Sequence, residues 1–202
     1  MHAPIILAST SLYRRQLLAK TGLIFSCQAP EIDETPFAGE DAAALVQRLA
    51  REKACAVAQQ HDQGWVIGSD QVCVLDGQIV GKPGSHEQAY RQLAQASGQV
   101  VTFYTGLCLQ DSTSGRQQLL MEPFDVHFRR LTPSQIQHYL QQEQPYDCAG
   151  SFKSEGLGIC LFERLSGRDP NTLIGLPLMA LIDMLANWGL MLPLPVDQLG
   201  DA

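Results

Sequence analysis

The sequence predicts an α/β fold in which helices flank a mixed, elongated sheet. Short apolar runs alternate with segments that carry apolar residues at helical spacing, as strands alternating with helices do. Two long runs of alternating apolar and polar residues, over 100–110 and 119–129, add a pair of antiparallel strands, which we expect to form a lobe of their own. Hydrophobic residues make up 45% of the chain and charged residues 17%, which excludes a disordered chain.

The first third of the chain is expected to hold three strands and two helices. Ser11 stands where it can cap a helix that follows an apolar strand. Leu45, Leu49 and Val57 recur at helical spacing in an alanine-rich segment. In chain order, the expected elements are a strand over 5–8, a helix over 11–20, a strand over 23–29, a helix over 41–61 and a strand over 65–68.

The rest of the chain is expected to add a hairpin, two long strands, a short strand and three helices. The pair Asp76-Gly77 is typical of a hairpin turn, and Ser85 and Thr132 each begin a capping box. Pro193 and Pro195 predict a loosely attached tail. In chain order, the expected elements are a hairpin over 72–80, a helix over 85–98, strands over 100–110 and 119–129, a helix from 132, a strand over 158–165, a last helix over 171–188 and the tail over 191–202.

Charge and composition limit the partners of this protein. The 202 residues include 14 Lys and Arg against 21 Asp and Glu, a net charge of −7. No basic excess exists to neutralise a nucleic-acid polymer, but a single nucleotide needs only a few local cations. The six scattered cysteines indicate a reducing compartment, and the first residues lack the basic region of a signal peptide. The most apolar stretch, 173–194, is too interrupted for a membrane span, so we expect a cytoplasmic protein with no membrane partner.

The turn after the first strand is a candidate phosphate site. Ser9, Ser11 and Arg14 follow the apolar run and open a helix. Hydroxyls and an arginine at a helix N-terminus suit an anion. Ser11 alone is equally well explained as a plain helix cap.

Two lysines and several carboxylates could complete such a site. Asp70 follows the strand over 65–68 and Ser69, at a position where a carboxylate is paired, metal-bound or solvated by a loop. Lys53 and Lys82 stand in compact motifs, unlike ordinary surface lysines. Glu34 belongs to an acidic loop that could supply oxygen ligands to Mg²⁺. Together these residues indicate a polyphosphate ligand.

Eight ordered motifs give the chain a family resemblance. It resembles the Maf family of nucleoside triphosphate pyrophosphatases from about residue 4 to 190. Leu12 departs from the proline that the family commonly has at this helix start, where proline only pre-organises φ. The matching motifs are Leu7-Ala8-Ser9-Thr10-Ser11-Leu12-Tyr13-Arg14, Asp33-Glu34, Glu52-Lys53-Ala54, Ile67-Gly68-Ser69-Asp70, Gly81-Lys82-Pro83, Phe103-Tyr104-Thr105-Gly106, Gly150-Ser151-Phe152-Lys153-Ser154-Glu155-Gly156 and Gly175-Leu176-Pro177.

The resemblance implies both a fold and a reaction. The fold is a single Maf-like domain over 1–202, of the Maf and ITPase type, with two lobes around a central cleft; it also suggests a homodimer. The reaction is hydrolysis of the α–β phosphoanhydride of a nucleotide with a divalent cation, Mg²⁺ or Mn²⁺. Asp70 is then the proton acceptor, and Glu34 and Asp70 hold the metal. The remaining residues contact the triphosphate: Ser9, Ser11, Arg14, Lys53 and Lys82.

Within the family, the variants of two motifs resemble the branch that hydrolyses 7-methyl-GTP. Tyr13 would stack on the cationic methylated base, and Glu155 would accept hydrogens from the guanine edge. Gln71 would contact the base or the sugar. Two alternatives remain open: a dTTP/UTP or broad-range pyrophosphatase, and a non-catalytic nucleotide-binding regulator of cell division. As a plain structural explanation, Tyr13 is a half-buried helix aromatic and Glu155 a surface charge.

Overall fold

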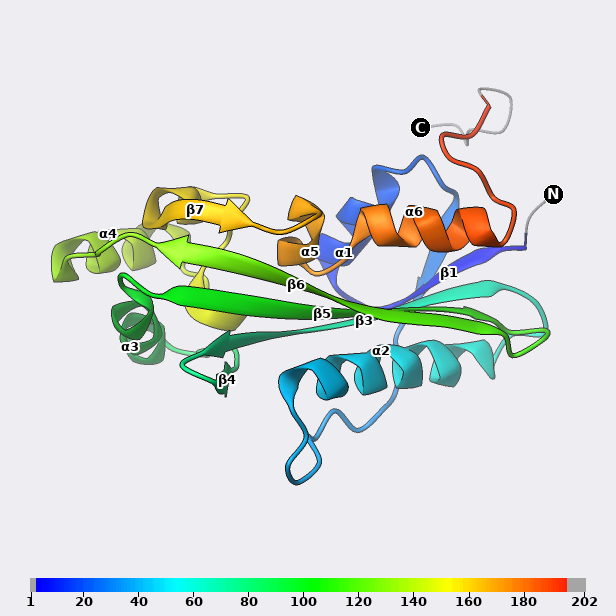
Figure 1. Cartoon of the computed structure of the whole chain (residues 1–202), viewed down its shortest axis with the longest axis horizontal. Coiled ribbons are helices and arrows are strands. Elements are labelled where there is room, and N and C mark those ends of the chain that lie inside the picture. Colours follow the sequence, from blue (N-terminus) through cyan, green and yellow to red (C-terminus); the bar gives the residue numbers. More distant parts are fainter. Residues whose placement is uncertain (1–2, 196–202) are drawn as a thin grey trace. The chain divides into compact units, whose positions relative to one another are not determined.

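The computed structural model describes residues 3–195 and contains, within them, one seven-stranded sheet (Figure 1). The hydrogen-bonded order is β2-β1-β3-β5-β6-β7, and β4 pairs with β3. β1 runs parallel to β2 and β3, whereas β4 and β7 run antiparallel to their neighbours, so the predicted mixed sheet is confirmed. The strands are β1 (Ile5–Ala8), β2 (Phe25–Gln28), β3 (Trp65–Leu75), β4 (Gln78–Val80), β5 (Val100–Asp111), β6 (Gln117–Phe128) and β7 (Phe162–Ser166).

Four helices begin at polar caps, of which the sequence predicted Ser11, Ser85 and Thr132. Ser11, Asp41, Ser85 and Thr132 each accept a hydrogen bond from the backbone N–H three residues later, which satisfies an otherwise unpaired donor of the first turn. Two short 3₁₀ turns, Ala149–Ser151 and Leu157–Leu161, precede β7. The helices are α1 (Leu12–Ala19), α2 (Ala42–Ala58), α3 (His86–Ala96), α4 (Pro133–Glu143), α5 (Pro170–Ile174) and α6 (Leu178–Asn187).

The chain divides into two compact units. The first holds the described residues up to Gln71, then Thr105–Glu122, and the described residues from Gly175 onward. The second holds Val72–Tyr104 and Pro123–Ile174. The expectation that the two long strands form a lobe of their own was wrong, because β5 and β6 each have residues in both units.

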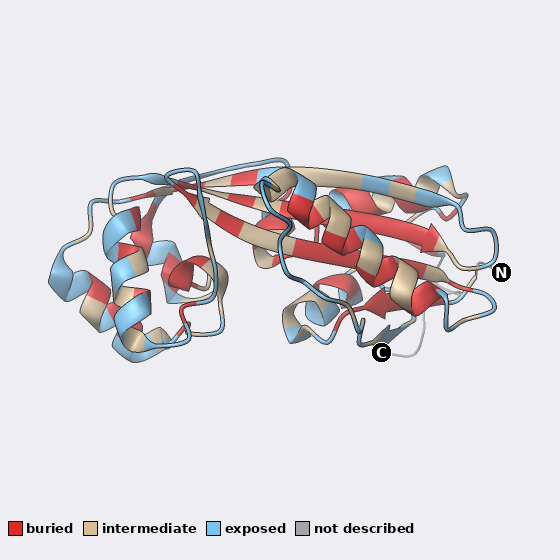
Figure 2. Ribbon diagram, turned by 90° about the horizontal axis from the view of Figure 1, so that it is seen from below, coloured by how far each residue is buried: buried red, intermediate tan, exposed pale blue. Residues whose placement is uncertain are grey.

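Each unit has its own apolar core, and buried residues follow the strands and the inner faces of the helices (Figure 2). The first core packs the small residues Ala50, Ala54 and Val57 of α2 against Ile6 and Val66 of the sheet. The core of the second unit is built around aromatic rings in edge-to-face contact, with centroids 4.8–5.6 Å apart. These rings are Phe103, Phe128, Phe152 and Phe162.

Three elements differ clearly from the prediction. The strand expected over 158–165 begins only at Phe162, as β7, because Leu157–Leu161 form a 3₁₀ turn. The strand over 65–68 and the first hairpin strand are one strand, β3, so Asp70 lies inside a strand and not in a loop after it. The expected last helix over 171–188 is two helices, α5 and α6. Gly175, at φ +116°, and Pro177 separate them, because neither residue fits a continuous helix at these positions.

The C-terminal end is more firmly packed than expected as far as it is described. Leu190 and Leu194 belong to the first unit and are buried within it. Residues 196–202 of the predicted tail lie outside the described residues. Among residues 3–195, no helix has both the length and the apolar character that crossing a membrane requires.

Candidate active site

Close packing of α2 on the sheet determines where its lysine lies. A Cβ on Gly68 of β3 would stand 2.1 Å from the carbonyl oxygen of Ala50, and one on Gly106 of β5 would stand 2.1 Å from that of Val46. Only glycine therefore allows the helix backbone to lie directly on these two strands. One helical turn beyond Ala50, this approach brings Lys53 against β3.

Lys53 joins two carboxylates that come from different parts of the chain. Its Nζ lies 2.7 Å from Asp70 Oδ1 and 2.7 Å from Glu34 Oε1. Lys53 is 5% exposed and Asp70 is 7% exposed, whereas the Glu34 side chain is 58% exposed. A buried ammonium is tolerated only when it is paired, and here each carboxylate contributes one oxygen to the pairing. The three predicted residues therefore meet at one point.

The β1–α1 turn lies beside Asp70 because of the strand register. β1 runs parallel to β3 with Leu7 opposite Ile67, so the chain leaves β1 at the level of Ser69 and Asp70. Ser9 Oγ accepts a hydrogen bond from the backbone N–H of Ser11 at 3.1 Å. Ser11 Oγ caps α1 by accepting from Arg14 N at 3.4 Å. Ser11 is thus a helix cap, and its role toward a phosphate stays a prediction.

Arg14 is fixed by a carbonyl from the far end of the sequence. Its Nε donates to Gly175 O at 2.9 Å, and Ser69 Oγ donates to the same oxygen at 3.0 Å and to Gly106 O at 2.9 Å. Burial lowers the pKa of Arg14, while the negative charges of Asp70 and Glu34 act in the opposite direction. The guanidinium is therefore within electrostatic reach of both predicted metal ligands.

Gln71, one of the three predicted specificity residues, is held by a contact to a neighbouring strand. Its Nε2 donates to Thr105 Oγ1 at 2.9 Å, which directs the amide along β5. Tyr13 is partly buried on α1, one residue before Arg14. Both residues belong to the first unit, together with Asp70.

Lys82 and Glu155 belong to the second unit. Both are exposed, and Ser154 Oγ donates to Glu155 Oε2 at 3.2 Å. The segment that carries Glu155 is anchored to α4 because Glu143 Oε2 accepts from Leu157 N at 2.8 Å. The assignment of Lys82 and Glu155 to the nucleotide site stays a prediction.

The donor set around Lys53 fits a hard divalent cation. Carboxylate oxygens are the protein ligands that Mg²⁺ prefers, and it commonly takes one or two of them together with water and substrate phosphates. Glu34 and Asp70 converge on one ammonium, and each carboxylate keeps lone pairs that this ion pair does not use and that a shared cation could take. Among the described residues, no group of three or more His, Cys, Asp or Glu side chains could hold a metal alone. The set therefore suits a cation whose coordination the substrate completes.

Sequence reasoning gave no role to two residues that organise this site. Ser69 and Gly175 stood in recognised motifs, yet their joint hydrogen bond is visible only in three dimensions. A serine next to a predicted acid inside an apolar strand is the one signal that could have marked Ser69.

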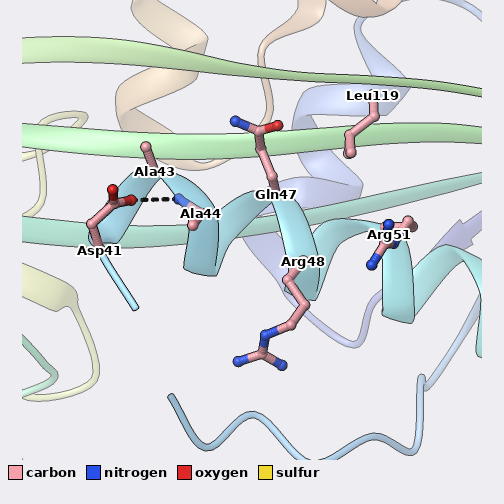
Figure 3. Close-up of a pocket in the computed structure, with 7 residues that line it drawn as sticks. All are labelled: Asp41, Ala43, Ala44, Gln47, Arg48, Arg51 and Leu119. Atoms are coloured by element: carbon pink, nitrogen blue, oxygen red, sulfur yellow. Dashed lines mark hydrogen bonds between the residues drawn. The ribbon is translucent and has the colours of Figure 1, made fainter. Parts of the chain in front are cut away.

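A shallow pocket of about 460 Å³ lies along the N-terminal half of α2 (Figure 3). It contains none of the predicted site residues. Its lining consists of Asp41, Ala43, Ala44, Gln47, Arg48, Arg51 and Leu119.

Two examples represent the solved structures that are similar to this chain. One is a nucleoside-triphosphatase, a dITP/XTP pyrophosphatase, from Mycobacterium abscessus: the identity is 14%, the match covers 63% of this chain and 75% of that one, and the TM-score is 0.38. The other is the Ham1 protein of Staphylococcus aureus: the identity is 13%, the match covers 77% of this chain and 89% of that one, and the TM-score is 0.45. Likenesses at this level carry no argument about activity.

The sequence itself identifies the family. The model of the Maf-like protein family matches residues 4–188, a span that includes every residue predicted for the site. It also includes the glycines that place α2 on the sheet and the carbonyl that fixes Arg14. The chain therefore belongs to the Maf-like protein family.

Proposed function

We propose that the protein is a nucleoside triphosphate pyrophosphatase that hydrolyses 7-methyl-GTP to 7-methyl-GMP and pyrophosphate. The single observation that carries this proposal is the convergence of Glu34 and Asp70 on Lys53, with Arg14 within electrostatic reach. Membership of the Maf-like family supports it. Carboxylates, a buried lysine and a partly buried arginine are groups that can serve the hydrolysis of a phosphoanhydride.

The charges of this cluster support a role for a divalent cation. Arg14 and Lys53 supply two positive charges, and Glu34 and Asp70 supply two negative charges, so the four side chains offer a triphosphate no net attraction. A bound divalent cation would polarise the phosphate oxygens and neutralise their charge. Glu34 and Asp70 are the residues that would hold it, and Lys82 would add a further positive charge.

Asp70 is the proposed proton acceptor. Lys53 fixes the direction of its carboxylate through Oδ1, which leaves Oδ2 to accept a proton from a water molecule. That water attacks the α-phosphorus, the bond from this phosphorus to the bridging oxygen breaks, and pyrophosphate leaves. Arg14, held by Gly175, is oriented to stabilise the charge that develops on the phosphate oxygens.

The preference for 7-methylguanine is proposed from three side chains. Methylation at N7 gives the base a positive charge, which favours stacking on Tyr13. The Glu155 carboxylate would accept the N1–H and exocyclic amine of guanine, and it would repel the carbonyl oxygens of thymine or uracil. Gln71, directed by Thr105, would contact the base or the sugar.

The direct test is a panel of nucleotides with Mg²⁺ or Mn²⁺, read as pyrophosphate release. We expect 7-methyl-GTP to be hydrolysed with the highest kcat/KM. A preference for dTTP or UTP would refute the assigned specificity while keeping the reaction. A protein that binds nucleotide and releases no pyrophosphate would instead be the non-catalytic regulator.

Asp70→Asn tests the proton acceptor. We expect kcat to fall by about 10²–10⁴-fold, the usual contribution of a general base, with the fold retained. The matched control is Asp76→Asn, the same change at an exposed turn residue of the β3–β4 hairpin, which should leave kcat unchanged. Equal turnover of Asp70→Asn and wild type would remove Asp70 from this role.

Glu155→Gln tests the reading of the base. The amide can donate to a pyrimidine carbonyl, so the ratio of 7-methyl-GTP to UTP hydrolysis should fall. Glu163→Gln makes the same change at an exposed position of β7 and should not move this ratio.

A further inference from the structure

A long connector without helix or strand brings Glu34 to Lys53. Residues 29–41 join β2 to α2, and connections of this length are uncommon unless they serve a function. The Glu34 side chain is 58% exposed, so solvent screens its end of the pair with Lys53, and this one contact does little to order a connector of 13 residues. Something else must therefore hold the connector in place.

Arg48 supplies that attachment. It lies on α2, and its side chain points away from the strands (Figure 3). Its Nε donates to Glu40 Oε1 at 2.7 Å and its Nη2 to Glu40 Oε2 at 2.8 Å, a two-bonded pair of the kind only arginine makes. Nη2 also donates to the carbonyl oxygen of Thr35 at 3.1 Å. Thr35 directly follows Glu34, so this bond fixes the residue next to the proposed metal ligand.

Further contacts make the attachment a closed network. The guanidinium carbon lies 4.0 Å from the centre of the Phe37 ring, a cation–π contact. Phe37 N donates to Glu40 Oε2 at 3.0 Å, and Glu40 N donates to Phe37 O at 3.0 Å. The side chains of Arg48 and Glu40 are only 10% and 8% exposed, so solvent screens the pair weakly. Hydrogen bonds from Arg48 lower the pKa of Glu40 to about 2.

We propose that Arg48 is a positioning residue that presents Glu34 to the site and thereby sets the affinity for the divalent cation. Arg48 and Lys53 lie on the same helix, so one rigid element holds the connector at Thr35 and Glu40 and holds the carboxylate of Glu34 itself. The inference rests on the proposed function, because it treats Glu34 as a metal ligand.

The experiment compares Arg48→Ala with the wild type in pyrophosphate release, in Mn²⁺ binding and in hydrogen exchange. The half-saturating Mg²⁺ concentration for pyrophosphate release should rise by about tenfold or more, as is usual when a residue supporting a metal ligand is lost. kcat at saturating Mg²⁺ should stay within about twofold, because Asp70 and Lys53 are intact. Binding of Mn²⁺ alone, measured by calorimetry, should weaken in parallel.

A third readout does not depend on activity or on metal. Hydrogen exchange of the Phe37 and Glu40 amides should accelerate in Arg48→Ala, because both are protected by the network that Arg48 closes. Arg48→Lys keeps the charge but not the paired bonds, so it should give an intermediate Mg²⁺ requirement. The matched control is Arg91→Ala, which removes an exposed ion pair with Glu87 on α3 and should change none of these values.

The outcomes separate this inference from the proposed function. Unchanged Mg²⁺ dependence together with unchanged exchange of the connector would overturn the role of Arg48. Faster exchange with unchanged Mn²⁺ binding would also overturn it, because the connector would then be ordered for some other purpose. If no nucleotide is hydrolysed by the wild type, the proposed function fails, while Mn²⁺ binding and exchange still decide the role of Arg48.

Discussion

Replacing Gly68 by alanine should separate α2 from the sheet. The new Cβ would stand 2.1 Å from Ala50 O and 2.8 Å from Ala54 N. An ordinary carbon–oxygen contact is about 3.3 Å, so the helix must retreat by about 1 Å. The same retreat along the Lys53–Asp70 bond would stretch its 2.7 Å toward 4 Å, beyond hydrogen-bond distance. Since the obstacle is backbone, we expect the upper end of overpacking costs, about 3 kcal/mol.

Chemical unfolding in urea, followed by circular dichroism, measures this cost. For a chain of this length about 3 kcal/mol also corresponds to a fall in Tm of roughly 6–12 °C. Gly81→Ala is the matched control, because a Cβ there meets nothing within 4 Å and its change in stability should stay within about 0.5 kcal/mol. If Gly68→Ala unfolded at the same urea concentration as Gly81→Ala, the close approach of α2 to β3 would be wrong.

Three further predictions concern ionisable groups. Lys53→Met should destabilise the fold by about 3–5 kcal/mol, because it leaves the Asp70 carboxylate buried and unpaired. Adding Asp70→Leu should recover most of this loss of stability in urea unfolding. A double variant no more stable than Lys53→Met alone would contradict the pairing. Hydrogen bonds from Arg48 lower the pKa of Glu40 from 4.5 to about 2, so Glu40 stabilises the fold above pH 4.5 and this contribution is lost toward pH 2. The Tm difference between wild type and Glu40→Gln should therefore shrink as the pH falls from 4.5 to 2. A constant Tm difference would exclude this link between protonation and stability. Burial raises the pKa of Cys108 to about 12, so at pH 8 a thiol reagent should modify the exposed Cys27 and reach Cys108 only after unfolding. Mass spectrometry detects which cysteine is modified. Early modification of Cys108 would show that the core around it opens in the folded protein.

Local signals in the sequence were sufficient for most element boundaries. Ser11, Asp41 and Thr132 begin helices through bonds to residues three positions away, and such bonds can be inferred from the residue types alone. The order of the motifs likewise predicts Glu34, Lys53 and Asp70 as site residues from the sequence alone. Their convergence is the part of the site that the structure supplied.

Features that depend on distant partners could not be predicted. Ser69 and Asp70 suggest a loop because polar residues interrupt the apolar pattern, yet β3 continues through them. It does so because Gly175 O and Gly106 O accept from Ser69 while Lys53 pairs with Asp70, and none of these partners is local. The bonds from Arg48 to Glu40 are also invisible in the sequence, since a charged pair eight residues apart has no preferred geometry.

The carbonyl of Gly175 has a consequence for how the protein becomes active during synthesis. It is held by Arg14, 161 residues earlier, and by Ser69, 106 residues earlier. β1, β2 and β3 can pair while the chain is still growing, since all three end by Leu75. Arg14 cannot take its final orientation until the segment before α6 has left the ribosome. Arg14 thus becomes ordered late in synthesis, and a nascent chain that stops before residue 175 would contain these strands but lack the carbonyl that orients Arg14.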